Sequence, residues 1–354
     1  MRPAFALLGL LLVSPSRAED TKPASAAEVQ CAIDAGVAWL KSKQRPDGSW
    51  GPCRKGENCY LTGPTSLAVF ALSRSGVPKS DRSIRKALKW LRDFQSNRRL
   101  RSGSRTSYEY ASLVLMLTEL NKSKKRVKTT RNRHIRPVGS RFTGDEWRWM
   151  IELVESAGYQ WRQERDVVDA MFASLAARAS AREGYPVGSS RWWDTAVDLR
   201  WYQNPNGGFP FGDGLTWSTG ETAAGLATLL ICREQLALKK AKQPPWLDDV
   251  IKKAYAHLRK HFDPRENYSP NPPAHRYHYC YLYAAKVVGT VSRRLEIGSK
   301  DWYLNGARWL LKEQKKDGRW VDRTCIKPRD VLGTCFALLF LERPDMVLLV
   351  PTGD

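Results

Sequence analysis

The chain has 354 residues, with 58 Lys and Arg against 36 Asp and Glu, and its formal net charge is +22. After the amino-terminal segment, no apolar run approaches the roughly 18 residues that a membrane-spanning helix needs, which excludes a span in the rest of the chain. The seven cysteines are an odd number, so in an oxidising compartment at least one thiol stays unpaired or bridges to another molecule.

The amino terminus has the features of a secretory signal peptide. Arg2 gives a basic start, residues 4–13 carry no charge, and Ser16-Arg-Ala18 supplies small residues at the cleavage site. The apolar core is too short to span a bilayer, and Glu19 stands where a lipid anchor would need a cysteine. We therefore expect residues 1–18 to be removed. The mature protein then loses two arginines, keeps a net charge of +20, and is secreted or periplasmic.

A short linker at residues 19–27 leads into the first helical unit. Apolar residues recur there at helical spacing between charged ones, which predicts an amphipathic helix: Val29, Ile33, Val37 and Leu40. The segment Gln44-Arg-Pro-Asp-Gly-Ser-Trp50 then predicts a turn, and residues 65–72, apolar or small nearly all round, predict a buried helix. Cys53 and Cys59 flank a short loop after the turn and are the best disulfide candidates.

This order of helix, turn and buried helix recurs along the chain. A second full copy of the turn is Gln314-Lys-Lys-Asp-Gly-Arg-Trp320. A degenerate (worn) copy, with Phe in place of the Trp, is Gln203-Asn-Pro-Asn-Gly-Gly-Phe209. A leucine lies four residues before each Gln, and partial copies of this step occur elsewhere: Leu91 with Gln95, and Leu258 with Phe262. The leucines are spaced by about 54 residues on average, which predicts an eroded unit near Trp147. Six units then fill residues 28–343.

A helix that is polar on one side alternates with a helix that is buried on both sides, which implies an outer and an inner layer. Six such hairpins predict an all-α (α/α)6 toroid. An open solenoid is the alternative, but it would need polar caps at both ends. Because the first and last units are the best copies of the turn, closure of the ring is favoured. A basic insertion at residues 121–141 and a tail at residues 344–354 lie outside the repeat.

The turn Gln-x3-Gly-x-Trp after such a helix resembles the repeat of squalene and oxidosqualene cyclases and of protein prenyltransferase β subunits. The chain is similar to a secreted, bacterial-type member of this terpenoid cyclase and prenyltransferase superfamily. The resemblance implies the toroid, and it implies that the motif residues tie one hairpin to the next, a structural role: Gln44, Gly48, Trp50, Gln203, Gln314, Gly318 and Trp320.

The residues that perform the superfamily's chemistry are missing from the sequence. The resemblance implies an Asp-x-Asp-Asp acid for a cyclase and an Asp-x-Cys zinc pair for a prenyltransferase, and neither motif occurs. His275, His278 and Cys280 are ligand-like but match no standard zinc spacing. We therefore expect no metal and no cofactor, and an isoprenoid cyclase or transferase is the least favoured function.

Two glutamates at the starts of predicted inner helices are weak catalytic candidates. Glu109 and Glu221 each follow a hydroxyl residue by three positions, which is the pattern of a capping box. Capping would explain both without a substrate and is the favoured interpretation. The alternative is an enzyme that acts on acidic polysaccharide, since lyases and hydrolases need carboxylates that face one cleft. Asp330 is interpreted in the same way, as an N-cap.

The amino ends of parallel inner helices would add partial positive charge at one mouth of the ring. Aromatic and polar residues delivered there form the predicted ligand-binding mouth: Tyr60, Tyr108, Tyr110, Trp217, His275, Tyr277, His278 and Asp330. Thirteen Lys or Arg lie between Arg98 and Arg141 against two acids, most of them in the basic insertion. A solvated loop is the favoured interpretation, and a contact surface for polyanions is the alternative.

The sequence therefore predicts an exported toroid that binds a ligand or a protein partner without catalysis and prefers anionic ligands such as acidic polysaccharide. Because export separates the protein from nucleic acid, nucleic acid is an unlikely partner in this interpretation.

Overall fold

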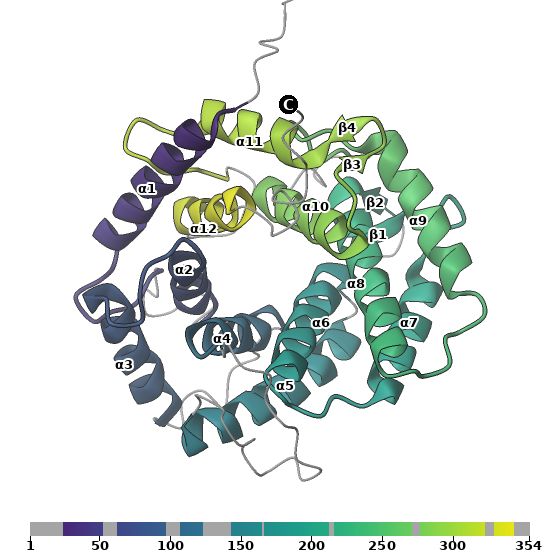
Figure 1. The fold of residues 1–354 in the computed structure, drawn as a ribbon, viewed down its shortest axis with the longest axis horizontal. Helices are drawn as coiled ribbons and strands as arrows, with labels where there is room; N and C mark the ends of the chain where they lie inside the picture. Colours follow the sequence, from purple (N-terminus) through teal and green to yellow (C-terminus); the bar gives the residue numbers. More distant parts are fainter. Residues whose placement is uncertain are drawn as a thin grey trace, which may run out of the picture.

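The structure is a computed structural model, and it describes residues 24–51, 62–96, 107–122, 143–164, 166–211, 216–270, 277–322 and 329–342. In these ranges twelve helices form two concentric rings (Figure 1). The outer ring consists of α1 (Ala26–Ser42), α3 (Arg82–Ser96), α5 (Gly144–Glu164), α7 (Ser189–Tyr202), α9 (Leu247–His261) and α11 (Trp302–Glu313). The inner ring consists of α2 (Gly63–Arg74), α4 (Ser107–Leu120), α6 (Val167–Arg182), α8 (Thr219–Leu238), α10 (His278–Ser292) and α12 (Arg329–Leu341). None of the helices in the described part is long and apolar enough to cross a membrane.

The inner ring is closed. Each inner helix packs against the next inner helix of the chain, and α12 packs against α2. The last outer helix, α11, likewise contacts α1. The predicted all-α (α/α)6 toroid is therefore confirmed, and the open solenoid is excluded because its end units would lie apart.

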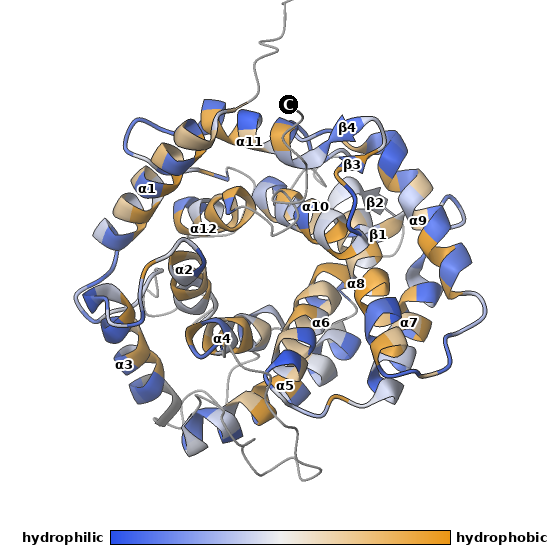
Figure 2. Cartoon of the chain, viewed as in Figure 1, coloured by the Kyte–Doolittle hydropathy of each residue, from blue (hydrophilic) through white to orange (hydrophobic). Residues whose placement is uncertain are grey.

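The two rings differ in polarity as the sequence patterns predict. In α12 every residue from Val331 to Leu341 is buried, because this helix faces the lumen on one side and the outer ring on the other. The outer helices turn hydrophilic residues outward and apolar residues toward the inner ring (Figure 2). The eroded unit near Trp147 is α5 with α6, and Trp147 and Leu153 are buried in the core.

The three motif glutamines each join their own unit to the next outer helix. Gln44 Nε2 donates to Ser83 O of α3 at 2.7 Å and to Gly48 O of its own turn at 2.9 Å. Gln203 Nε2 reaches Val250 O of α9 at 3.0 Å in the same way. Gln314 Nε2 donates to Ala32 O of α1 at 2.9 Å, so the last turn of the repeat holds the first helix and fastens the ring.

The motif tryptophans join each turn to the two helices of its own unit. Trp50 Nε1 donates to Leu40 O at 2.7 Å, and the backbone N–H of Trp50 donates to Thr65 Oγ1 at 3.0 Å. Trp320 makes the equivalent bonds to Leu310 O at 2.8 Å and Thr334 Oγ1 at 3.0 Å. Both indoles are buried in the core. A leucine of the outer helix and a threonine of the inner helix therefore fix the turn between them.

Two short hairpins of strands were not predicted. Strands β1 (Phe209–Phe211) and β2 (Thr216–Ser218) pair antiparallel, with Phe209 opposite Ser218, and lead from the worn turn into α8. Strands β3 (Glu296–Ile297) and β4 (Lys300–Asp301) pair before α11. Each is two or three residues long, below the length that the sequence pattern could register.

Several predicted segments fall outside the described residues. These are the signal peptide, the cysteines Cys53 and Cys59, nearly all of the basic insertion, and the tail. The linker prediction differs slightly from the structure at its end, because α1 begins at Ala26, where Ser25 and Glu28 form a capping box. Of the described cysteines, Cys31, Cys232 and Cys335 are free thiols, and Cys280 is buried in α10.

Candidate functional site

The starts of the inner helices meet at one mouth of the ring, and Glu109 links two of them. Its side chain is 3% exposed, and Oε1 accepts from Thr62 N at 2.8 Å and Gly63 N at 3.2 Å. The carboxylate therefore caps α2, the preceding inner helix. The predicted capping box of its own helix α4 involves Thr106, which lies outside the described residues. Bound in this way, Glu109 stabilises the contact between two helix starts.

Glu221 has a different environment, at the start of α8. Ser218 Oγ accepts from Glu221 N at 3.2 Å, so the serine half of the predicted capping box is present. The glutamate half is not, because Glu221 Oε2 is buried without a hydrogen-bond partner. Burial, and then the charge of Asp166, raise the pKa of Glu221 to about 8. At neutral pH this carboxyl is protonated and can donate a hydrogen bond, which capping alone does not explain.

The predicted aromatic mouth is dispersed in the structure. Tyr108 packs edge-on against Phe172 inside the ring, with centroids 5.2 Å apart. Trp217 packs instead on the outer helix α9, at 4.2 Å from His257 and 4.6 Å from His261. Tyr277 is the N-cap residue of α10, with a φ of 60°, and Tyr110 packs against the core from α4.

The remaining predicted mouth residues have structural contacts or lie outside the described part. His278 Nε2 lies 3.0 Å from Pro264 O, and its ring packs on Trp309 at 4.4 Å. Burial lowers the pKa of His278 to about 4, so the ring is neutral. Asp330 is the second residue of α12 and accepts from Val331 N at 2.9 Å; it lies inside the helix and not at the expected N-cap. Tyr60 and His275 fall outside the described residues.

Aromatic side chains close the middle of the lumen. Phe172 of α6 and Phe336 of α12 come from opposite sides of the inner ring of helices, and the centroids of their aromatic rings are only 6.1 Å apart. Tyr283 of α10 completes the cluster at 6.3 Å from Phe172 and 5.9 Å from Phe336. The aromatic cluster therefore divides the lumen into two parts, and a ligand bound in one part cannot extend into the other.

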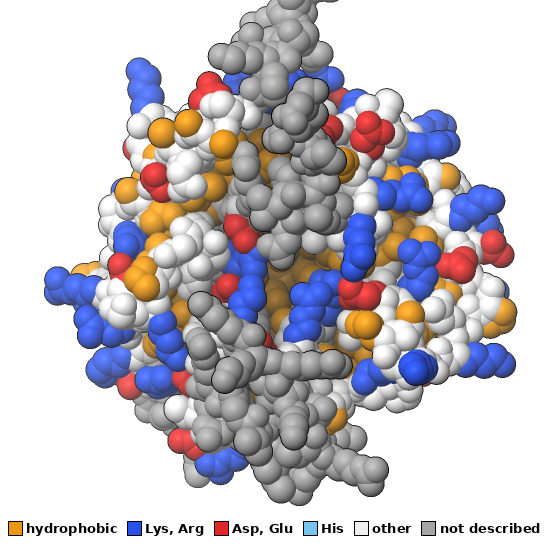
Figure 3. All heavy atoms as spheres, viewed as in Figure 1, with side chains coloured by type: hydrophobic (Ala, Val, Ile, Leu, Met, Phe, Trp, Pro, Cys, Tyr) orange, Lys and Arg blue, Asp and Glu red, His pale blue; other side chains and the backbone are white. Residues whose placement is uncertain are grey.

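A cavity of about 260 Å³ lies at the carboxyl ends of the inner helices. Its apolar lining comes from five inner helices: Phe70, Leu115, Leu175, Tyr283, Val287 and Leu339. Charged residues at or near the carboxyl ends of these helices form its rim: Arg74, Lys122, Arg178, Arg182 and Lys286 with Glu119, Glu183 and Glu342. The rim thus carries a net charge of +2. On this face, hydrophobic atoms are visible at the centre of the ring with charged side chains around them (Figure 3).

Ion pairs hold the rim cations in place. Arg178 forms a two-pronged pair with Glu234, at 2.6 and 2.7 Å. Arg74 bridges Glu342 and Glu119; burial alone would lower its pKa, but the two carboxylates raise it above the ordinary value. Lys286 Nζ donates to Leu339 O at 2.6 Å, at the end of α12. Thr290 also lines the cavity, and its buried hydroxyl has no hydrogen-bond partner.

Sequence reasoning missed this cavity. It placed the binding site at the amino ends because the repeated turns and the aromatic residues lie there. A signal was present toward the other ends, since several otherwise apolar inner helices carry charged residues in their carboxyl-terminal halves, as at Arg74, Glu119 and Lys286.

Comparison with known proteins supports the architecture. The family model of the squalene-hopene cyclase C-terminal domain matches residues 21–123, which contain the first two units with their turn and its glutamine bridge to α3. This match supports the predicted resemblance to the terpenoid cyclase and prenyltransferase superfamily of α/α toroids.

Among solved structures, this toroid is similar to the type II terpene cyclase MstE from Scytonema. One MstE variant, in complex with merosterolic acid A (product), has a TM-score of 0.49 and 13% identity, and the match covers 89% of this chain and 96% of that chain. A second variant, in complex with geranylgeranyl dihydroxybenzoate (substrate), has a TM-score of 0.48 and 12% identity, with 89% and 97% covered. The apo form gives 0.48 and 12%, with 89% and 98% covered. No curated protein matches the chain.

The described part of this toroid offers no cluster of three or more His, Cys, Asp or Glu side chains that could hold a metal ion. His278 and Cys280 lie in the first turn of α10, where the histidine contacts Pro264 and Trp309. Their contacts are those of packed helix residues.

Proposed function

We propose that this toroid is an exported, non-catalytic binding module, and that the cavity at the carboxyl ends holds the apolar part of an anionic ligand. The observation that carries the proposal is the combination of an apolar floor with a rim of net charge +2. Ligand sites are typically apolar clefts with a few placed polar groups. Here the charged groups have a net positive charge, so they favour a carboxylate or sulfate at the entrance.

The size of the cavity limits the ligand. Its volume of about 260 Å³ is slightly below the usual range for drug-sized ligands, roughly 300 to 1,000 Å³. The cluster of Phe172, Tyr283 and Phe336 blocks extension through the lumen. The ligand is therefore short, and its charged group stays at the rim of the cavity, where the lining residues have a net positive charge.

Titration with three probes that share an eight-carbon chain tests this proposal. We expect octanoate to bind at least tenfold more tightly than octanol, because only octanoate meets the basic rim, and octyltrimethylammonium to bind least. Leu175→Trp should weaken octanoate at least tenfold by filling the cavity, whereas Leu238→Trp, at a position 71% exposed on α8, should leave it unchanged. Equal binding of the three probes, or full binding by Leu175→Trp, would contradict the proposal.

Export is the second part of the proposal and rests on residues 1–18. Determination of the amino terminus of the protein recovered outside the cytoplasm should give Glu19 as the first residue. Changing Ala18 to a bulky residue should block cleavage, since the signal peptidase site needs small side chains. Recovery of the intact chain inside the cell only, starting at Met1, would show that the segment is not an export signal.

A further inference from the structure

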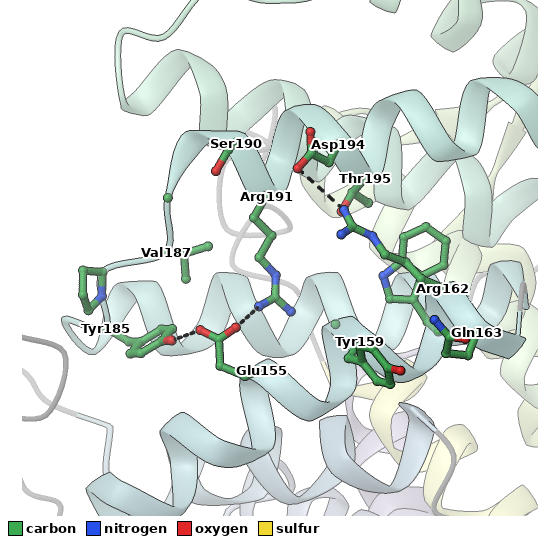
Figure 4. A pocket seen from close by; sticks show the side chains of 14 residues that line it. Glu155, Tyr159, Arg162, Gln163, Tyr185, Val187, Ser190, Arg191, Asp194 and Thr195 are labelled. Atoms are coloured by element: carbon green, nitrogen blue, oxygen red, sulfur yellow. Dashed lines mark hydrogen bonds and ion pairs between the residues drawn. The ribbon is translucent and has the colours of Figure 1, made fainter.

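A groove on the outside of the ring lies where a motif turn is missing. Where the full turn is present, its glycine lies against the next outer helix. A Cβ on Gly48 would come within 2.6 Å of Lys86 O, and one on Gly318 within 2.5 Å of Ala35 O. In the third unit, α5 ends at Glu164 and α6 begins at Val167, with no room for such a turn. The first helical turns of α7 are therefore not covered by a motif turn. A groove of about 630 Å³ lies between this part of α7 and the end of α5 (Figure 4).

Two guanidinium groups line this groove from opposite walls. Arg191 of α7 donates to Val154 O at 3.0 Å, and its next contact, Glu155, is 3.9 Å away. Arg162 of α5 pairs through Nε with Asp198 at 3.0 Å and lies 3.9 Å from Asp194. Because a guanidinium has five N–H donors, these contacts leave donors on both residues for a ligand in the groove.

Carboxylates balance these cations. Glu155 and Asp194 line the same groove, so the charged lining residues sum to zero. The carboxylates of both are about half exposed, at 53% and 55%, and Glu155 also accepts from Tyr185 OH (Figure 4). A ligand with a net charge of either sign would meet repulsion as well as attraction here, whereas a neutral ligand with many hydroxyl groups can accept from the arginines and donate to the carboxylates together.

Exposed aromatic rings lie beside the polar groups. Tyr159 lines the groove and is 66% exposed, and Trp201 is 83% exposed. Trp201 lies on the stripe of α7 that holds Asp194 and Asp198, since residues four and seven positions apart share a helix face. Trp is mostly buried in folded proteins. A flat ring with a polar handle suits a ligand that has an apolar face and polar edges, and a sugar ring has both.

We propose that the groove between α5 and α7 is a binding site for neutral oligosaccharides. Tyr159 stacks on a sugar ring, Arg162 and Arg191 donate to sugar oxygens, and Asp194 accepts from sugar hydroxyls. The site lies on the outer ring and does not depend on the cavity of the inner ring.

Calorimetric titration with neutral hexasaccharides of glucose, mannose and N-acetylglucosamine tests this site. We expect at least one of them to bind, and Tyr159→Ala and Asp194→Asn each to lower the association constant roughly tenfold, as a loss of about 1.4 kcal/mol implies. Asp145→Asn is the matched control, because Asp145 lies at the far end of α5 and its carboxylate is 90% exposed. Leu238→Ala, at an exposed position of α8, controls for loss of an apolar side chain.

Three results would overturn this assignment: no binding of any neutral hexasaccharide at millimolar concentration, equal losses in the control variants, or binding confined to uronic acid or glucosamine oligomers. Octanoate titration of Tyr159→Ala separates this site from the inner cavity. Octanoate should bind the variant as it binds the unchanged protein, so either proposal can fail while the other stands.

Discussion

Gly318→Ala should lower the free energy of unfolding by roughly 2 to 5 kcal/mol. The φ of Gly318 is +93°, where an L-residue costs about 1 to 2 kcal/mol. The new Cβ would also meet Ala35 O of α1 at 2.5 Å, and forcing extra atoms into such a contact costs roughly 1 to 3 kcal/mol more. Urea unfolding followed by circular dichroism would measure the loss.

Gly76→Ala is the matched control for this substitution. Gly76 has a similar φ of +88°, but no atom lies within 4 Å of the Cβ it would gain. Gly76→Ala should therefore lower the free energy of unfolding only through backbone strain, by about 1 to 2 kcal/mol. The difference between the two variants isolates the contact between the last turn and the first helix. Equal losses would show that this contact does not hold the ring closed.

Glu221→Gln should change how stability depends on pH. In the folded protein the pKa of Glu221 is about 8, whereas a glutamate in an unfolded chain titrates near 4.3. Between these values the folded state holds a proton that the unfolded state releases, so the contribution of Glu221 falls as pH rises from about 4.5 to 8 and is level above that. Because glutamine resembles the protonated acid at every pH, Glu221→Gln should not lose stability through this group as the pH rises.

The expected size of this effect is several kcal/mol, on the order of 1.4 kcal/mol for each pKa unit between the two states. Unfolding of both proteins at pH 4.5, 6, 7 and 8 should show similar stability at pH 4.5 and a growing advantage of Glu221→Gln toward pH 8. Glu152→Gln, at an exposed position of α5, is the control and should follow the unchanged protein. Parallel profiles for all three would show that Glu221 titrates normally.

The repeat made the fold predictable because its determinants are local in sequence. The bond from Trp50 to Leu40 spans ten residues, and the glutamine bridges reach one unit ahead, so a spacing of about 54 residues fixes both rings. Even the eroded unit was placed correctly by counting.

The candidate sites could not be predicted in the same way, because they depend on contacts across the ring. Arg74 pairs with Glu342, 268 residues away, and Phe172 meets Phe336 from the opposite helix. Ser218 was correctly identified as a helix cap, but the direction of the Glu221 side chain depends on how α6 and α10 pack beside it. The groove arises from a turn that the third unit lacks, and an absent motif gives no positive signal in a sequence.

The bond from Gln314 to Ala32 has a mechanical consequence. In a linear array of repeats, the outermost repeats have a single neighbour, and melting can start from them. Here every hairpin has a neighbour on each side, so unravelling must first break an interior seam, and we expect one cooperative transition without fraying from either terminus.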